Sequence, residues 1–216
     1  LVLNNVLLAV SALVVFIGTI WPLVAEMAFA RKLSVGPPFF DMAFTPFMVI
    51  LALILPVGAI LPWKRARIGR ALKQLRWALI LALALGALAW AMQTGRSSLG
   101  PVGLFLGTWL VAGSVVDLLG RTGRGAIGAR LRRMARLPRA DWGKAVAHGG
   151  LGVTMAGIAA MMAWEAEDIR VLQVGEHLEI AGYGLRLDEV HQEQGPNYVA
   201  TKATFTLSQN GREIGE

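Results

Sequence analysis

Cysteine is absent from the 216 residues. This absence excludes a disulfide framework, a thiolate nucleophile, an iron–sulfur site and a cysteine-ligated zinc site within them. The sequence also contains no Walker loop, dinucleotide fingerprint, ordered Ser-His-Asp set or metal-ligand histidine pair. Charged residues are scarce, at 16% of the chain against 55% hydrophobic residues. A soluble globular domain does not have this balance, so the composition indicates an integral membrane protein.

Five apolar stretches are long enough to be considered as membrane spans, at residues 3–24, 44–61, 77–92, 99–119 and 146–164. A helix rises ~1.5 Å per residue and the hydrocarbon core is ~30 Å thick, so ~20 residues are needed to cross it. The third stretch is short unless its helix includes Leu72 and Leu75. We therefore predict that residues 1–164 form a mainly α, polytopic membrane helix bundle of about five transmembrane helices. Trp109 lies in the middle of a span, where we expect it to pack between helices.

Two loops hold most of the basic residues, and basic loops stay on the cytoplasmic side of a membrane. Their Lys and Arg residues are Lys64, Arg65, Arg67, Arg70, Lys73 and Arg76 in the first loop, and Arg121, Arg124, Arg130, Arg132, Arg133, Arg136, Arg139 and Lys144 in the second. This distribution predicts a cytoplasmic N-terminus. We interpret the charges as topology anchors beside a lipid bilayer, and we expect no nucleic-acid partner.

After Trp164 the composition changes, because residues 165–216 contain ten acidic and four basic residues. Polar and apolar residues alternate around Leu178, Leu185 and Phe205, and hairpin signals occur at 182–184 and 210–211. We predict a small β domain at 165–216, on the outer side of the membrane. The chain opens almost inside a span and ends just after a hairpin signal, so we expect it to be a fragment of a longer protein.

The most informative single residue is His148, in the motif AHGGLG at 147–152. Histidine is rare inside membrane spans, where it serves in metal or haem ligation and in proton relays. On a helix, His148 shares a face with Gly152 and with Met155 or Ala156. Small residues there allow another helix to approach closely or leave room for a flat macrocycle. Haem ligation, an interhelical hydrogen bond, and proton or substrate transit all remain open from the residues alone.

Four segments extend the interpretation: GTIWPL at 18–23, SVGPPFF at 34–40 followed by Asp41, AHGGLG at 147–152, and GPNY at 195–198. In order and spacing the chain resembles the C-terminal part of the CcmF family, membrane subunits of the bacterial cytochrome c haem lyase. The resemblance implies a multi-pass protein of the bacterial inner membrane with a periplasmic C-terminal segment. It also implies a role in cytochrome c biogenesis by system I, the cytochrome complex assembly pathway.

In that family, haem is taken from a CcmE-type haem chaperone and joined to the CXXCH motif of apocytochrome c, together with a CcmH-type thiol-handling subunit. The resemblance makes His148 an axial ligand of an intramembrane b-type haem used for electron transfer, with Gly149 and Gly152 in the groove beside it. Because His148 follows Lys144 by four residues, we expect the iron ~6 Å inside the cytoplasmic edge. The second ligand is expected upstream of Leu1, so this portion alone is not expected to be a competent lyase.

The same resemblance marks a periplasmic signature loop of Gly36, Pro37, Pro38, Phe39 and Phe40. For this loop we expect a contact with a neighbouring helix first, and a contact with delivered haem or a partner second. His177 and His191 lie in the β segment, and we interpret them as exposed polar residues.

Two other classes of function stay open. A transporter would use His148 for proton coupling and spans broken at Pro46 and Pro56 for passage of a substrate, and it would carry no visible chromophore. A non-catalytic membrane scaffold would dock periplasmic partners through its acidic β domain.

Overall fold

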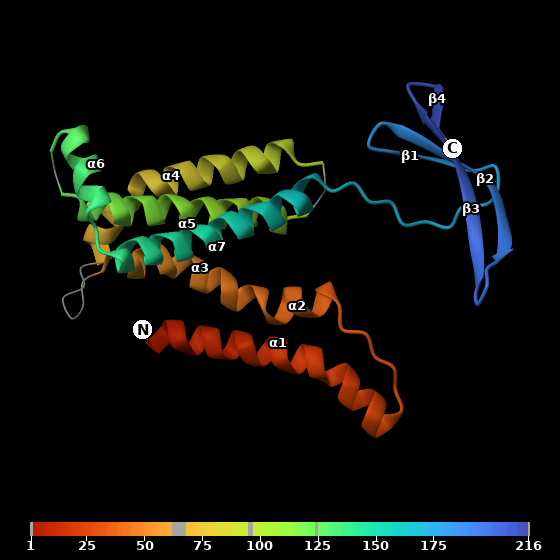
Figure 1. Cartoon of the computed structure of the whole chain (residues 1–216), viewed down its shortest axis with the longest axis horizontal. Coiled ribbons are helices and arrows are strands. Elements are labelled where there is room, and N and C mark those ends of the chain that lie inside the picture. The colour runs from red at the N-terminus through yellow and green to blue at the C-terminus, as the bar shows by residue number, and fades with distance from the viewer. Residues whose placement is uncertain (1, 62–67, 95–96, 124, 216) are drawn as a thin grey trace. The chain divides into compact units, whose positions relative to one another are not determined.

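The computed structural model describes residues 2–61, 68–94, 97–123 and 125–215 (Figure 1). The chain divides into two compact units, Leu1–Ala163 and Trp164–Glu216. The first is helical and the second is a four-stranded antiparallel sheet, so the predicted fold class is confirmed. Among the predicted topology anchors, Lys64, Arg65, Arg67 and Arg124 lie outside the described residues.

Within the described residues, four helices are long and apolar enough to cross a membrane: α1 (Val2–Phe29), α4 (Ile68–Met92), α5 (Leu99–Arg121) and α7 (Arg139–Trp164). A fifth candidate is the pair α2 (Pro37–Ala43) and α3 (Thr45–Ile60), bent by 49° at Phe44. Helix α4 includes Leu72 and Leu75, which gives the third stretch its missing length. A short additional helix, α6 (Ile127–Ala135), lies between α5 and α7, where the sequence was interpreted as a loop.

Pro37 to Phe40 are helical, whereas the sequence analysis treated them as a loop. Gly36 is the N-cap, and the two prolines occupy the first turn of α2, where a missing N–H leaves no hydrogen bond unmade. The Phe39 and Phe40 rings meet edge to face with centroids 5.2 Å apart. Both rings pack on α1 at Gly18, where a Cβ atom would lie only 2.7 Å from Phe39 Cε1.

Helix α5 also packs against α3, which contains a proline. Proline inside a helix lacks the N–H donor and bends the chain, and Pro56 lies in α3 with its ring against Gly113 of α5. A Cβ atom on Gly113 would lie 2.5 Å from Pro56 Cβ. One turn away, the buried Trp109 indole donates a hydrogen bond to the Leu53 carbonyl at 3.1 Å. Trp109 therefore packs between helices.

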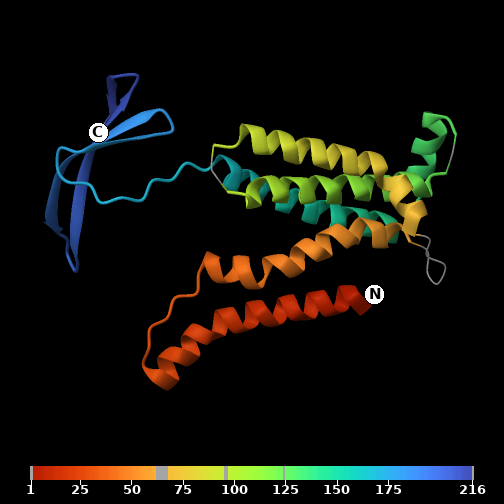
Figure 2. The ribbon, with the colours of Figure 1, turned by 180° about the vertical axis from the view of Figure 1, so that it is seen from behind.

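Helices α5 and α7 run antiparallel in close backbone contact (Figures 1 and 2). A Cβ atom on Gly103 would lie 2.6 Å from Ala159 Cβ, and one on Gly107 would lie 2.6 Å from the Gly152 carbonyl oxygen. Gly100 meets Ala163 in the same way, at 2.9 Å. Small residues are enriched where membrane helices approach closely. These pairs, together called the α5–α7 contact, fix how the two helices are aligned.

The second unit is a meander of β1 (His177–Ile180), β2 (Tyr183–Gln194), β3 (Val199–Gln209) and β4 (Arg212–Gly215). The turns at 181–182 and 210–211 have positive φ at both central residues, as two-residue hairpins require. Leu178, Leu185 and Leu207 are partners across three strands, and Leu187 pairs with Phe205. Residues paired across strands share a face, so these side chains form one apolar face of the sheet.

The contact at Gly18 yields a first prediction. Gly18→Ala is expected to destabilise the protein by about 1–3 kcal/mol, because the added methyl overlaps both phenylalanine rings. Gly58→Ala is the matched control in α3, since no atom of the described residues lies within 4 Å of its Cβ position. It is expected to be neutral or slightly stabilising, as alanine favours helix by about 1 kcal/mol. Thermal unfolding in detergent measures both, and equal midpoints for the two variants would contradict the contact.

Candidate functional site

His148 lies on the face of α7 that is turned towards α3 and α5. One and two turns further along that face, Leu151 and Met155 pack on a core of Ala52, Leu106 and Leu110. One turn before it, Lys144 Nζ donates a hydrogen bond to the Ala59 carbonyl of α3 at 3.2 Å. The imidazole is half-buried, and neither ring nitrogen makes a hydrogen bond within the described ranges. Its nitrogens are therefore free to bind a ligand from outside these helices.

Four charged side chains join α5 to α7 directly beside this position, and we call them the charge cluster: Asp117, Arg121, Asp141 and Lys144. Lys144 Nζ lies 2.5 Å from Asp117 Oδ2, and Arg121 Nε lies 3.4 Å from Asp117 Oδ1. The second link is between Arg121 Nη1 and Asp141 Oδ1, at 2.7 Å. Two anions and two cations leave the cluster formally neutral.

Asp117 is the functional candidate that the sequence analysis missed. Its side chain is only 8% exposed, and a carboxylate is tolerated at such a position when it is paired. A signal was available, because Asp117 is the one acidic residue in the 99–119 stretch and acidic residues inside spans are rare. Lys144, from which the depth of the iron was estimated, is also the ion-pair partner of Asp117.

Gly149 and Gly152 were expected to leave a groove beside His148. At Gly152 helix α5 fills that space, since a Cβ atom there would lie 2.7 Å from the Gly107 carbonyl oxygen and 2.8 Å from Leu110 Cβ. At Gly149 the nearest neighbour is Ser114 Cβ at 3.7 Å, which is an ordinary packing distance. Gly152 therefore serves the α5–α7 contact in this structure, whereas Gly149 has room for a Cβ atom.

The signature residues Gly36 to Phe40 belong to a different part of the helical unit. Phe39 and Phe40 lie at the contact of α1 and α2, whereas His148 lies on α7 beside α5. An apolar groove of about 790 Å³ runs between α4, α5 and α7, with Trp77, Val111 and Val153 in its wall. His148 is not among the residues that line this groove.

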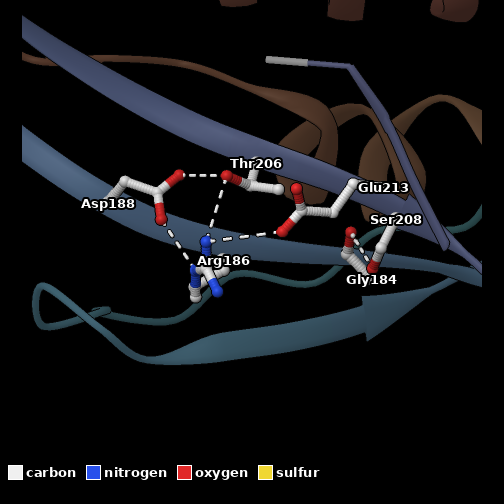
Figure 3. Close-up of polar contacts among 6 residues, drawn as sticks. All are labelled: Gly184, Arg186, Asp188, Thr206, Ser208 and Glu213. Carbon is white, nitrogen blue, oxygen red and sulfur yellow. Dashed lines mark hydrogen bonds and ion pairs between the residues drawn. The ribbon is translucent and has the colours of Figure 1, made fainter. Parts of the chain in front are cut away.

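The sheet of the second unit carries a polar network around Arg186 (Figure 3). Arg186 Nε donates to Asp188 Oδ1 at 2.7 Å, and the Thr206 hydroxyl donates to Asp188 Oδ2 at 2.5 Å. Both bonds favour the charged carboxylate, and they hold the pKa of Asp188 below its usual range, with the Thr206 bond as the larger cause. Glu213 Oε1 lies 3.7 Å from Arg186 Nη2. Arg186 therefore joins carboxylates of two strands, β2 and β4, on this sheet.

The other two histidines, His177 and His191, belong to the second unit, whereas His148 belongs to the first. His177 lines a small polar groove with Glu179 and Arg186, and His191 Nδ1 lies 3.3 Å from Glu189 Oε1. In the part of the chain that the structure describes, no three His, Asp or Glu side chains are grouped to hold a metal ion. A metal bound at His148 would therefore take its other ligands from a cofactor or from outside this chain.

Comparison with known proteins gives a consistent set of relatives. Residues 163–216 match the family model for the CcmF C-terminal beta-sandwich. The chain is 52% identical to the cytochrome c-type biogenesis protein ccl1 of Rhodobacter capsulatus, over 99% of this chain and 32% of that protein. It is 40% identical to CycK of Bradyrhizobium diazoefficiens, over 99% of this chain and 33% of that protein. It is 32% identical to CcmF of Escherichia coli, over 98% of this chain and 32% of that protein.

A solved structure, the cytochrome c haem lyase CcmF, matches with a TM-score of 0.56 and 27% identity. The match covers 98% of this chain and 33% of that one. The chain thus spans about a third of the length of the relatives it matches. Together with its candidate membrane helices, these relatives make it a multi-pass membrane protein.

The charge cluster yields the second prediction. Lys144→Met is expected to destabilise the protein by about 2–3 kcal/mol, because it leaves the buried Asp117 carboxylate with only the more distant Arg121. Adding Asp117→Asn to Lys144→Met is expected to recover part of the loss, since no buried charge then remains unpaired. Thermal unfolding of the two variants in detergent checks this, and additive losses in the double variant would contradict the pairing.

Proposed function

This chain belongs to the CcmF family, as part of its C-terminal portion, and we propose that it supplies one axial ligand, His148, of a b-type haem held within the membrane. The observation that supports this most is the state of the imidazole. It is half-buried on α7, and neither nitrogen is hydrogen-bonded within the described residues. An axial ligand needs one such free nitrogen, and imidazole binds iron in both of its common oxidation states.

The haem, when bound, supplies one-electron transfer. This chain positions the ligand. The α5–α7 contact fixes where His148 lies along α5, and the charge cluster holds the helical turn that precedes His148 against α5. The chain has three histidines, and the other two lie in the strands. A second histidine ligand within the membrane would therefore come from outside this chain, which covers about a third of its relatives.

In this proposal the whole protein is a haem lyase of the system I pathway of cytochrome c biogenesis. Haem from a CcmE-type chaperone is joined to the CXXCH cysteines of apocytochrome c, with a CcmH-type subunit handling the thiols. Each thioether forms when a substrate S–H adds across a haem vinyl C=C, so one C–S and one C–H bond replace the S–H bond and the vinyl π bond. No thiol of this chain is needed, which agrees with its lack of cysteine.

The same proposal sets the location. The protein would lie in the bacterial inner membrane with its N-terminus in the cytoplasm and residues 165–216 in the periplasm, as the basic loops favour. The periplasmic unit would then face the chaperone, the thiol-handling subunit and the apocytochrome. Its ten acidic and four basic residues would attract basic partners.

The third prediction tests the ligand directly. In the purified full-length protein, His148→Ala is expected to remove most of the b-type Soret absorbance, because the iron loses a protein ligand. His191→Ala is the control, since that side chain is exposed beside Glu189 in the sheet. A Soret band unchanged in His148→Ala would overturn the ligand assignment, and a wild-type protein without haem would favour a transporter.

The fourth prediction uses the neutral charge cluster one turn from His148. Lys144→Met leaves the cluster with an excess negative charge, and Asp117→Asn leaves it with an excess positive charge. Positive charge near the iron favours the reduced form, so Asp117→Asn is expected to raise the haem midpoint potential and Lys144→Met to lower it. A unit charge at ~10 Å with an effective dielectric constant of ~20 changes the ratio of reduced to oxidised haem on the order of tenfold.

A redox titration of the Soret band measures both variants. The opposite signs separate electrostatics from structural loosening, because both substitutions break the same ion pair. A shift in the same direction for both variants would show that the cluster acts on the haem only through folding.

A further inference from the structure

We propose that α6 is an interfacial helix that inserts its apolar face between lipids and binds the phosphates of anionic phospholipid headgroups with its arginines. The sequence of α6 is IGARLRRMA, and its apolar residues Ile127, Leu131 and Met134 recur at the spacing of one helical face. Arg132 lies on another face of the helix. Short amphipathic helices with a basic polar side and an apolar side lie in the plane of a membrane interface.

The apolar face of α6 is uncovered in the structure. Ile127 is 79% exposed and Leu131 is 58% exposed, although α6 itself is firmly attached. Arg130 donates from Nε to the Thr122 hydroxyl at 3.2 Å and from Nη2 to the Leu119 carbonyl at 3.1 Å, at the end of α5. The two apolar side chains are thus exposed even though hydrogen bonds hold α6 to the end of α5.

The chain itself brings α6 to the membrane surface. Helix α6 connects α5 and α7, which are both candidate spans, so it lies at the membrane face where α5 ends and α7 begins. It lies crosswise to α5 (Figures 1 and 2), the orientation of a helix in the plane of the interface. The Trp142 indole at the start of α7 donates to the Met134 carbonyl at 3.2 Å, and tryptophan favours this same layer.

Charge identifies the headgroup. Residues 121–140 contain seven arginines and no acidic residue. Arg130 is engaged with the end of α5, but the Arg132 and Arg136 guanidinium groups make no ion pair or hydrogen bond in the ranges that the structure describes. A guanidinium binds phosphate through two parallel N–H donors, and each basic residue at a membrane surface adds to the attraction for anionic lipid. An anionic phospholipid therefore complements both faces of α6.

The test uses the full-length protein in lipid nanodiscs, with single spin labels on introduced cysteines. This chain has no cysteine of its own, so Ile127→Cys, Leu131→Cys and Arg132→Cys each place one label in it. Labels at 127 and 131 are expected to be reached several-fold more readily by oxygen, which concentrates in lipid, than by a water-soluble nickel complex. The label at 132 is expected to show the reverse order.

A second arm separates the source of the phosphate. Replacing phosphatidylcholine with a mixture containing phosphatidylglycerol is expected to draw the labels at 127 and 131 deeper. Arg132→Gln combined with Arg136→Gln is expected to abolish that response, because about fivefold in surface affinity is lost for each arginine removed. Inorganic phosphate added to phosphatidylcholine nanodiscs is expected to have no such effect. Unchanged thermal unfolding midpoints of the labelled and glutamine variants confirm that the fold is kept.

Three results would overturn the proposal. Preferential access of the nickel complex at 127 and 131 would place the apolar face in water. Protection of both labels from both reagents would mean that another protein segment covers the face. Equal immersion in neutral and anionic nanodiscs, or a full response to inorganic phosphate, would remove the headgroup from the interaction.

Discussion

The close antiparallel approach of α5 and α7 is the constraint on which the rest of the helical unit depends. Lipid tails are as apolar as leucine, so membrane helices gain little by hiding apolar surface from them and depend on close packing instead. Gly103, Gly107 and Gly152 remove the side chains that would keep the two backbones apart. Beside this contact, the Asp117–Lys144 ion pair also requires α7 to stay at one position along α5. A shift of one turn would separate Asp117 from Lys144 and press Cβ atoms into opposing backbone.

Helix α5 then organises the other spans by the same use of small residues. Gly113 receives the proline of α3, and Gly86 of α4 lies so close to Phe105 that a Cβ atom there would come within 2.9 Å of it. The Trp109 indole donates a hydrogen bond to the Leu53 carbonyl of α3, which ties these two helices together. Helix α7, which carries His148, is thus one of three helices that pack on α5 through a glycine.

The features that follow from composition and periodicity could be predicted from the sequence, and those that depend on tertiary partners could not. The helical bundle and the sheet follow from hydropathy and from alternation around Leu178 and Leu185. Helix α6 was missed because its arginines mask a short apolar stripe, and its attachment depends on Arg130 reaching α5. The helical turn at Pro37 was missed because two prolines resemble a loop, although they suit a first turn. The partner of Lys144 is 27 residues away in sequence, and spacing rules do not reach that far.

The motif around His148 gains a different meaning from this packing. From the sequence, the glycines of AHGGLG allow either a close helix or a groove for a macrocycle. In the structure, α5 closes Gly152, while the imidazole nitrogens make no hydrogen bond within the described residues. Gly152 and His148 thus have different roles on α7, the first in helix packing and the second in the proposed ligand binding. Gly152 sets the distance between α5 and α7, and that distance decides where Lys144 and His148 stand relative to Asp117. Because the histidine is placed through the glycine, a bulkier residue at 152 would move the imidazole without touching it.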